Sequence, residues 1–327
     1  MGRTIILKTR VTEIFGIKYP IVQGGLAYLA YAELAAAVSN AGGLGQLTAA
    51  TLRTPEKLRE EIHKVRKLTN QPFGVNFAIA QHDGHYLDLL QVAIEEKVPA
   101  ISITGGNPTP VFEKLKGHDI RTLVLVSGVR QAQKAEELGA DAVMAVGQEG
   151  GGHLGRDDIG TMVLIPRVVE SVSIPVLASG GIGDGRGLLA AFALGAEGIE
   201  MGTRFIATQE CIHAHETYKQ AILTAKETDT VIIKRSLGSP GRVLKTDYTL
   251  DIIKREQNGD TYDDLKDIIS GKANTRYIYE GNEDEGFAWV GQVVGLIDNI
   301  PTVQELFNEM ITTAEEGISR INKLFGE

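Results

Sequence analysis

Eight short hydrophobic runs recur between residues 21 and 201, and each is followed by a segment whose apolar residues have helical spacing. The runs are apolar on both faces, which is typical of parallel strands that are covered by helices or buried in a barrel. Eight β-then-α units predict an α/β protein, either a (β/α)8 TIM barrel or a doubly wound sheet. The predicted strands are Ile21–Gln23, Gly43–Gln46, Phe73–Phe77, Ala100–Thr104, Thr122–Val126, Ala142–Val146, Val176–Ala178 and Gly198–Met201.

The predicted helices lie between these strands. One of them, Pro55–Leu68, has Thr54 at the N-cap position and Glu56 and Glu60 near the positive end of the helix dipole. The others are Ala32–Val38, Leu87–Glu96, Val111–Leu115, Gln131–Leu138, Met162–Val172 and Gly187–Leu194.

The β/α rhythm stops after about Glu210, where a different organisation begins. Two extended segments and three helical ones follow, and we interpret them as an inserted lid. The amphipathic segment Val303–Phe325 predicts a helix that returns to the barrel. We therefore expect a barrel of residues 1–212 and 286–327 and a lid of residues 213–285. The predicted lid elements are Ala214–Lys226, Val231–Lys234, Val243–Asp247, Tyr248–Asn258 and Tyr262–Ile269.

Glycine-bearing loops follow the last two predicted strands, and they favour the barrel over the doubly wound sheet. In barrel enzymes the loops after strands seven and eight often bind a phosphate. Glycine lets backbone N–H groups approach phosphate oxygens, and a serine or threonine hydroxyl can donate a further hydrogen bond. The alternative is two ordinary βα turns. The residues that a phosphate site would use are Ser179, Gly180, Gly181, Gly202 and Thr203.

Two more glycine clusters follow the first and sixth predicted strands, at 23–26 and 147–155. Close backbone approach at these points suits a flat ligand across the barrel mouth, and a flavin with one phosphate tail fits that description. Gly150-x-Gly152-x-x-Gly155 matches the dinucleotide fingerprint by its letters. No regular helix follows it, however, so the pattern does not support a Rossmann fold.

His153, in the second of these clusters, is the strongest candidate for catalysis. An imidazole accepts or donates a proton near neutral pH, although a surface histidine bonded to its own loop is the alternative. Asn76 ends the third strand, where its amide could bond to a flavin ring. His213 and His215 would share one side of a strand, but no third ligand is apparent, so we predict no metal site.

Composition and charge narrow the function classes. With 43% hydrophobic and 23% charged residues the chain is a folded globular protein, and a net charge of −9 argues against nucleic-acid binding. The single cysteine, Cys211, excludes an internal disulfide and a cysteine-based metal site. Residues 1–6 carry no signal-peptide pattern and no apolar run reaches about 18 residues, so we expect a cytoplasmic protein without a membrane partner. His82 and His85 are expected to cap a helix or face solvent.

Six motifs stand in order along the chain, at Pro20–Gly25, Ala41–Gly45, Pro72–Asn76, Gly150–Gly155, Ala178–Ile182 and Met201–Phe205. Together they resemble the nitronate monooxygenase family, formerly called 2-nitropropane dioxygenases, most strongly from Pro20 to Lys219. The same framework serves FMN-dependent enoyl-acyl-carrier-protein reductases and a group of bacterial NADH:quinone reductases.

The resemblance implies an FMN-binding TIM barrel with a small lid, in which His153 is the proposed catalytic base. It also implies a set of cofactor-binding residues. The phosphate would lie at Gly180, Gly181, Gly202 and Thr203, with Ser179 nearby, and the flavin ring near Gly24, Gly25, Leu26 and Asn76, with Gly151 and Met201 completing the set. Two segments depart from the family pattern: Leu123–Ser127 lacks a lysine found in some relatives, and Leu26–Leu29 replaces a common Met-x-Trp-Val.

The resemblance leaves two activities in competition. The first is the oxidation of alkyl nitronates or nitroalkanes by O2 to a carbonyl compound and nitrite, with His153 taking the α-proton or steadying the anion. The alternative is an NAD(P)H-dependent FMN reductase acting on quinones or on an enoyl-acyl-carrier protein. Lys234 and Arg235 could then meet a phosphate, or they could form a solvated charged face. A flavin-storage protein is a third option. The expected partners are small molecules, and a homodimer is one assembly left open.

Overall fold

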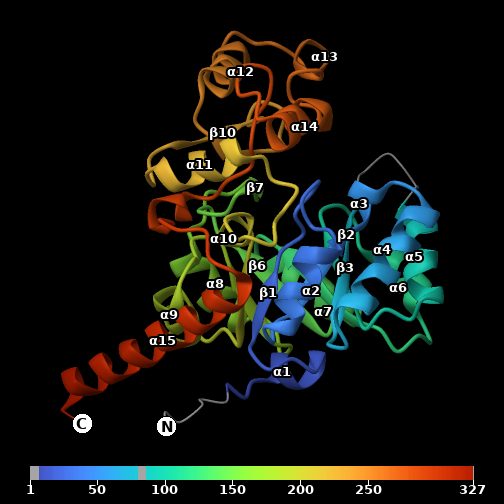
Figure 1. The fold of residues 1–327 in the computed structure, drawn as a ribbon, viewed down its shortest axis with the longest axis vertical. Coiled ribbons are helices and arrows are strands. Elements are labelled where there is room, and N and C mark those ends of the chain that lie inside the picture. The colour runs from blue at the N-terminus through green and yellow to red at the C-terminus, as the bar shows by residue number, and fades with distance from the viewer. Residues whose placement is uncertain (1–6, 80–85, 327) are drawn as a thin grey trace.

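A closed barrel of eight parallel strands forms the centre of the molecule (Figure 1). The structure is a computed structural model that describes residues 7–79 and 86–326. The barrel closes between β1 and β2, where Gln23 N donates to Leu44 O and Leu44 N donates to Ile21 O, each over 3.0 Å. Around the barrel the strands follow the order β1-β9-β8-β6-β5-β4-β3-β2. They are β1 (Ile21–Gln23), β2 (Gly45–Thr48), β3 (Phe73–Ala78), β4 (Ala100–Thr104), β5 (Arg121–Val126), β6 (Ala142–Val146), β8 (Val176–Ser179) and β9 (Gly198–Met201).

The eight predicted strands are confirmed, with ends that differ from the prediction by at most two residues. Closure of the sheet excludes the doubly wound alternative and confirms the TIM barrel. Three predictions fall outside the described residues, namely those on residues 1–6, His82 and His85.

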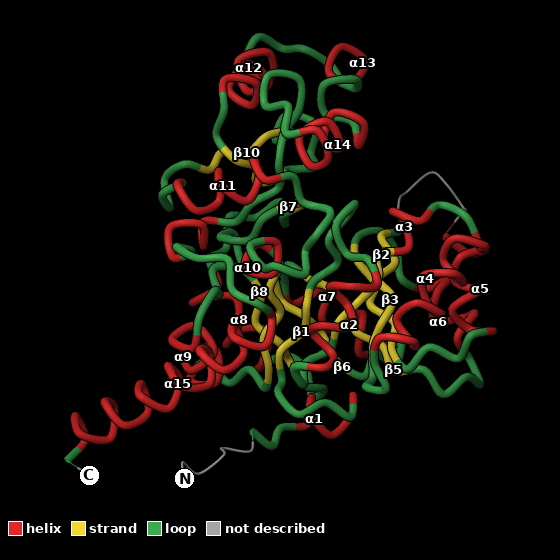
Figure 2. Tube along the Cα trace, viewed as in Figure 1, coloured by secondary structure: helices red, strands yellow, loops and turns green. Residues whose placement is uncertain are grey.

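Helices surround the strands on the outside of the barrel (Figure 2). The predicted helix Pro55–Leu68 is confirmed, and Thr54 Oγ1 accepts from Lys57 N over 3.3 Å at its start. The predicted Val303–Phe325 is also confirmed, as a helix that packs on α9 and α2 before its last turns extend away from the body. The barrel helices are α1 (Arg10–Phe15), α2 (Ala32–Asn40), α3 (Ala49–Leu52), α4 (Pro55–Leu68), α5 (Tyr86–Glu95), α6 (Thr109–Leu115), α7 (Val129–Glu137), α8 (Thr161–Val169), α9 (Gly185–Ala193), α10 (Thr203–Ile206) and α15 (Val303–Phe325).

Two apolar layers account for the burial of both faces of each strand. Outward side chains pack under the helices, and inward ones fill the barrel. Phe15 and Val11 of α1 join inward residues such as Leu123 and Leu177 in one cluster, so α1 covers the N-terminal end of the barrel. With that end filled, a ligand site is left to the C-terminal end.

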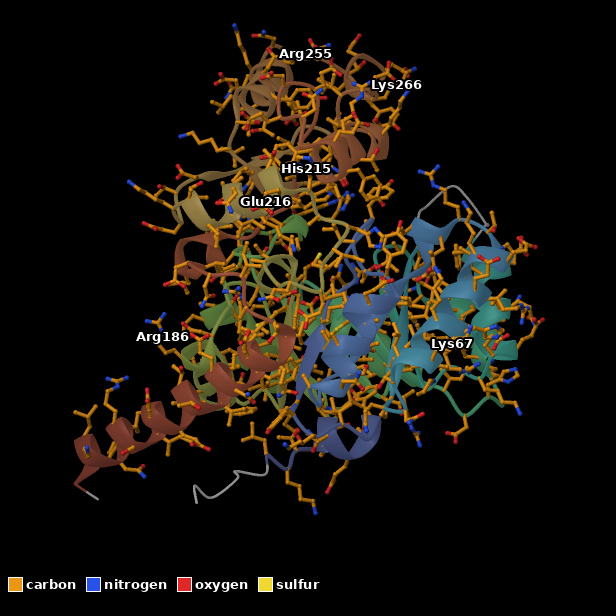
Figure 3. All side chains as sticks on the ribbon, viewed as in Figure 1. Lys67, Arg186, His215, Glu216, Arg255 and Lys266 are labelled. Atoms are coloured by element: carbon orange, nitrogen blue, oxygen red, sulfur yellow. The ribbon has the colours of Figure 1, made fainter. Side chains whose placement is uncertain are left out.

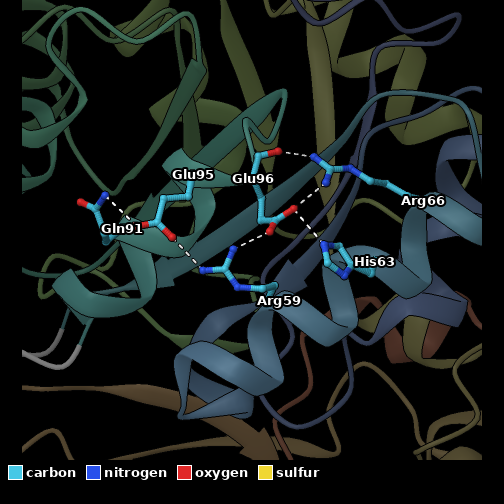
Figure 4. A network of polar contacts seen from close by, with 6 residues as sticks. All are labelled: Arg59, His63, Arg66, Gln91, Glu95 and Glu96. Carbon is cyan, nitrogen blue, oxygen red and sulfur yellow. Dashed lines mark hydrogen bonds and ion pairs between the residues drawn. The ribbon is translucent and has the colours of Figure 1, made fainter.

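A polar network ties α4 to the segment at the end of α5 on the outer surface (Figure 4). Glu96 accepts from Arg59 Nη1 over 2.5 Å, from Arg66 Nη1 over 2.7 Å and from His63 Nε2 over 3.0 Å. Burial acts to raise the pKa of Glu96, but these donors outweigh it and hold the pKa below its usual range. The network lies on the outside of the barrel and contains none of the residues predicted for the site, so we assign it to helix packing.

The lid covers the C-terminal end of the barrel. It has its own apolar cluster, in which Ile233, Val243, Ile252 and Ala273 pack with Phe287, two residues beyond the expected boundary at 285. That boundary stays a prediction. The lid elements are α11 (Glu216–Thr224), β10 (Thr230–Ile233), β11 (Gly241–Leu244), α12 (Asp247–Gln257), α13 (Tyr262–Leu265) and α14 (Gly271–Glu280), and the 3-10 helix η1 (Gln292–Leu296) follows them.

One lid prediction is wrong in its extent, and one lid helix was not predicted. The helix expected over Tyr262–Ile269 ends at Leu265, and the sequence analysis missed α14. Only Ala273, Tyr277 and Ile278 give α14 an apolar stripe, because Gly, Asn and Thr occupy much of the rest. Figure 3 shows Arg255 and Lys266 on the part of the lid that is remote from the barrel.

Candidate active site

A cavity of about 300 Å³ lies between the C-terminal ends of the barrel strands and the lid. The barrel contributes residues from the loops after β1, β6, β8 and β9, which are the four glycine-bearing loops of the sequence analysis. The lid side contributes Tyr218, Ile278 and Trp289. The predicted residues in the wall are Gly25, Leu26, Asn76, Gly151, His153, Ser179, Gly180, Gly181, Met201, Gly202 and Thr203.

Gly24 is the predicted cofactor residue that the cavity wall does not include. A Cβ on Gly24 would overlap Glu200 Oε1, and one on Gly25 would overlap the Asn76 amide. Glycine is therefore needed at both positions to leave room for the side chains of Glu200 and Asn76, whether or not a ligand also lies close.

The loops after β8 and β9 form one end of the cavity. Gly180 and Gly181 have φ values of +87° and +74°, a conformation that L side chains rarely adopt. Thr203 Oγ1 accepts from Gly291 N over 3.0 Å, and the hydroxyl keeps its proton for donation. Two consecutive left-handed glycines beside a free hydroxyl proton suit an anionic group such as a phosphate.

Polar side chains form the floor of the cavity, facing into the barrel. Asn76 Nδ2 donates to Ser102 Oγ over 2.9 Å, and the Ser179 hydroxyl donates to the Glu200 carboxyl. Burial raises the pKa of Glu200, and the hydrogen bond from Ser179 offsets only part of that effect. The Ser179 hydroxyl therefore donates its proton to Glu200, whereas the sequence predicted that this hydroxyl would lie near a phosphate.

Two buried oxygens of the barrel, one of them in the cavity wall, have no hydrogen-bond partner within the described part of the chain. They are Thr48 Oγ1, which lines the cavity, and Gln46 Oε1. A buried polar atom without a partner costs about 1–3 kcal/mol. A ring with polar edges, lying across the mouth, would remove that cost for Thr48.

His153 lies in a short strand, β7 (Gly152–His153), that the sequence analysis expected to be loop. β7 leaves the barrel after β6 and pairs antiparallel with β11 of the lid, with His153 opposite Gly241. The barrel loop thus becomes part of the lid sheet, and this pairing fixes the imidazole at the cavity wall.

The imidazole of His153 contacts a lysine that the sequence analysis placed on a phosphate-binding or solvated face. Its Nε2 lies 2.7 Å from Lys234 Nζ, and its ring centroid lies 5.0 Å from that of Trp289. The His153 side chain is exposed at the cavity wall, but it is densely surrounded by protein, and this desolvation, together with the Lys234 charge, lowers the pKa of His153 to about 4. Burial lowers the pKa of Lys234 to about 8. At neutral pH the pair is therefore a neutral imidazole and an ammonium ion.

The other two candidate histidines, His213 and His215, contact different partners. His213 and His215 lie in a turn before α11, where the His213 ring stacks on Tyr31 at 4.0 Å and His215 Nδ1 accepts from Thr217 N over 3.2 Å. Figure 3 shows His215 at the start of α11. Across residues 7–79 and 86–326, no group of three metal-binding side chains is present. Cys211 is buried, and burial raises the pKa of its thiol to about 12.

Comparisons with known proteins identify the family. A family model described as nitronate monooxygenase matches residues 8–88 and 81–313. The chain belongs to the nitronate monooxygenase family. This confirms the resemblance drawn from the motifs and makes the protein an oxidoreductase of a flavoenzyme family.

Three relatives of this family member cover almost its whole length. A probable nitronate monooxygenase of Staphylococcus saprophyticus is 34% identical over 96% of this chain and 99% of its own. A (3aS,4S,5R,7aS)-5-hydroxy-7a-methyl-1-oxo-octahydro-1H-indene-4-carboxyl-CoA dehydrogenase of Rhodococcus jostii is 35% identical over 97% and 99%. The structure of FabK from Thermotoga maritima superposes with a TM-score of 0.91, at 39% identity, over 98% of this chain and all of that one. Within the described residues, no helix is long and apolar enough to cross a membrane.

Proposed function

We propose that the protein is an FMN-dependent nitronate monooxygenase, which oxidises alkyl nitronates with O2 to a carbonyl compound and nitrite. The observation that carries this proposal is the neutral imidazole of His153 at the wall of the glycine-lined cavity. The three other titratable groups of the wall are engaged in hydrogen bonds. Glu149 accepts from Thr161 N over 3.0 Å, Glu200 accepts from the Ser179 hydroxyl, and Tyr218 donates to Trp289 O over 2.6 Å.

The residues of the cavity fit FMN. The left-handed Gly180 and Gly181 and the hydroxyl of Thr203 would hold the phosphate. Asn76 and Thr48 Oγ1 would meet the polar edge of the flavin ring. Bound there, FMN supplies the acceptor for electrons from the substrate carbon, and the chain supplies binding, orientation and charge.

His153 takes part as a hydrogen-bonding imidazole. Since its Nε2 accepts from the Lys234 ammonium, we assign the ring proton to Nδ1. A nitrogen lone pair that is engaged by a cation does not take a proton from carbon. Of the two roles considered for His153, the arrangement therefore favours steadying an anion over removing the α-proton of a neutral nitroalkane.

The test uses purified protein carrying FMN. We expect O2 uptake and nitrite release on addition of ethylnitronate, and no rapid bleaching of the flavin band when NADH is added without oxygen. Rapid anaerobic bleaching by NADH, together with no nitrite from ethylnitronate, would contradict the proposal.

A second candidate is an NAD(P)H-dependent FMN reductase or a dehydrogenase of acyl thioesters. It is favoured by the name of the Rhodococcus jostii relative, a carboxyl-CoA dehydrogenase. It is also favoured by chemistry, because the enolate of a thioester and a nitronate both place negative charge on oxygen next to a reacting carbon. Bleaching by NADH that is reversed by an enoyl thioester would select this candidate.

A further inference from the structure

Glu200 places a carboxyl group inside the barrel, at the end of β9, where it lines the cavity. Its partner in the register of the neighbouring strand β8 is Ser179. On the other side lies β1, and a Cβ on Gly24, directly after that strand, would overlap Glu200 Oε1. The chain thus has no side chain at position 24, and this leaves room for a carboxyl at the cavity.

The two oxygens of this carboxyl have different surroundings. Oε2 accepts the hydrogen bond from the Ser179 hydroxyl. Oε1 has no hydrogen-bond partner within residues 7–79 and 86–326, and the side chain is only partly buried, so Oε1 keeps access to the cavity. A neutral carboxyl whose Oε2 is already an acceptor carries its proton on Oε1. Oε1 is therefore the oxygen that can donate a hydrogen bond to a ligand.

The surroundings of Glu200 favour the protonated form of the carboxyl. In the described part of the chain no cation lies within 4.0 Å of it, and the flanking strands β1 and β8 contribute no charged side chain. The other titratable groups of the cavity wall are Glu149, His153 and Tyr218, and each of them bonds to a partner other than Glu200. Burial without a cation raises the pKa of Glu200 above its ordinary value.

Apolar side chains complete the floor of the cavity on the side away from Glu200. Glu200, Ser179 and Asn76 belong to β9, β8 and β3, whereas Leu125 of β5 and Met144 of β6 lie on the opposite side of the barrel. The isoalloxazine ring of FMN has an apolar end with two methyl groups and a polar end with carbonyl and ring-nitrogen acceptors. Matching like with like would put the polar end of the ring on the side of Glu200.

We propose that Glu200 is a cofactor-binding acid, whose neutral carboxyl donates a hydrogen bond from Oε1 to an acceptor on the polar end of the flavin ring. A donor of this kind adds a hydrogen bond to the ring without adding a charge. Since the complex holds the proton, FMN binding takes up a proton from solvent wherever the free protein has released it. The choice of FMN as the ligand rests on the proposed function, but the inference needs no particular oxidation reaction.

Infrared spectra report the protonation state of Glu200 directly. The carbonyl stretch of a protonated carboxyl lies at a higher frequency than the carboxylate bands, and Glu200→Gln removes it while keeping the shape of the side chain. The difference between parent and variant cancels the flavin carbonyl bands, and isotope labelling of glutamate identifies the band of the carboxyl.

In the parent holoenzyme at pH 7 we expect a carboxyl band that Glu200→Gln lacks. Its frequency should be lower than that of the same band in the FMN-free protein at pH 5, because the O–H group donates to the ring. A holoenzyme without this band, or a band that FMN does not shift, would overturn the proposal.

The affinity for FMN gives a second readout, with Glu197→Gln as the matched control. Glu197 precedes β9 at the other end of the barrel, where it accepts from Arg10 of α1. Where the free protein has released the Glu200 proton and the complex has kept it, the Kd of the parent should rise by up to about tenfold per pH unit. Glu197→Gln should follow the parent, whereas Glu200→Gln should lack this rise. The FMN phosphate, with a second pKa of about 6, titrates equally in all three proteins and cancels in the ratio of their Kd values.

The two readouts must agree on the pH at which Glu200 titrates. The ratio of the parent Kd to that of Glu200→Gln should begin to rise where the infrared band of the FMN-free parent disappears. A ratio that stays flat across that pH would contradict the coupling of FMN binding to proton uptake. If the band persists up to pH 9, a flat ratio is the expected result, and the shift of the band on FMN binding decides.

This proposal and the proposed function fail in different ways. If ethylnitronate is not oxidised but FMN shifts the Glu200 band, the cofactor-binding acid stands and the nitronate reaction does not. If ethylnitronate is oxidised but the holoenzyme lacks the band, the reaction stands and the acid does not. If FMN binds at no pH, both proposals fail.

Discussion

Replacing Glu200 by Gln should change how the stability of the flavin-free protein depends on pH. Glu200 is buried in the barrel floor, where it accepts from Ser179, and in the described part of the chain it has no cationic partner within 4.0 Å. Burial raises its pKa above the ordinary value of 4.5. Between pH 4.5 and the raised value, the folded protein keeps a proton that the unfolded chain has released.

The sign and the size of the change in the free energy of unfolding with pH follow from this difference in bound protons. A folded-state pKa above the unfolded one gives stability that is present at low pH and is lost as the pH rises. The free energy of unfolding should fall by about 1.4 kcal/mol for each pH unit inside this window. Glutamine keeps the shape and the acceptor for Ser179 but does not ionise, so Glu200→Gln should lack this slope.

The assay is urea unfolding at several pH values from 5 to 8, and the measured quantity is the difference between parent and variant, in which other titrating groups cancel. Glu197→Gln is the control. Burial acts to raise the pKa of Glu197, but hydrogen bonds from Arg10 outweigh it and the pKa is lowered, so its titration falls below pH 4.5. It should therefore shift the curve without changing its slope above pH 5. Parallel curves for the parent and Glu200→Gln would refute the reasoning.

Three further predictions concern the phosphate loop at Gly181, the imidazole of His153 and the buried guanidinium of Arg204. Gly181→Ala should weaken FMN binding about tenfold or more, because the added methyl group crowds the phosphate loop. The control is Gly139→Ala, which also has a positive φ but has no atom within 4 Å of the added methyl group, and it should lower the free energy of unfolding by only about 1 kcal/mol. An FMN fluorescence titration measures the first effect, and urea unfolding measures the second. His153→Gln should retain FMN and reduce turnover of ethylnitronate and of neutral nitroethane by a similar factor in steady-state assays; loss with nitroethane alone would restore His153 as the base. Arg204→Met should lower the free energy of unfolding, measured with urea, by about 2–3 kcal/mol. The reason is that the carbonyl oxygens of Ala207 and Asn299 lose the hydrogen bonds from the buried guanidinium, which are 2.6 and 2.7 Å long. A change below about 0.5 kcal/mol would contradict this.

The sequence by itself determined the barrel and the position of its ligand site. Strand and helix signals are local, and eight of them in succession leave few ways to pack a parallel sheet. Once the barrel exists, the C-terminal ends of its strands meet, so glycine loops such as 180–181 and 202–203 had to converge. Eleven of the twelve predicted site residues line the cavity for this reason, and of these twelve only Gly24 is not part of the wall.

Only the tertiary structure decided the chemistry of the cavity wall. The strands are apolar on both sides, so no alternation indicated that Glu200 faces inward toward Ser179. Lys234 lies 81 residues from His153, and the two meet because β7 pairs with β11 while Glu256 holds the turn after β10. Contacts of this kind depend on how the lid packs on the barrel. The residue pattern of one segment does not show which side chain of a distant segment will lie next to it in the folded protein.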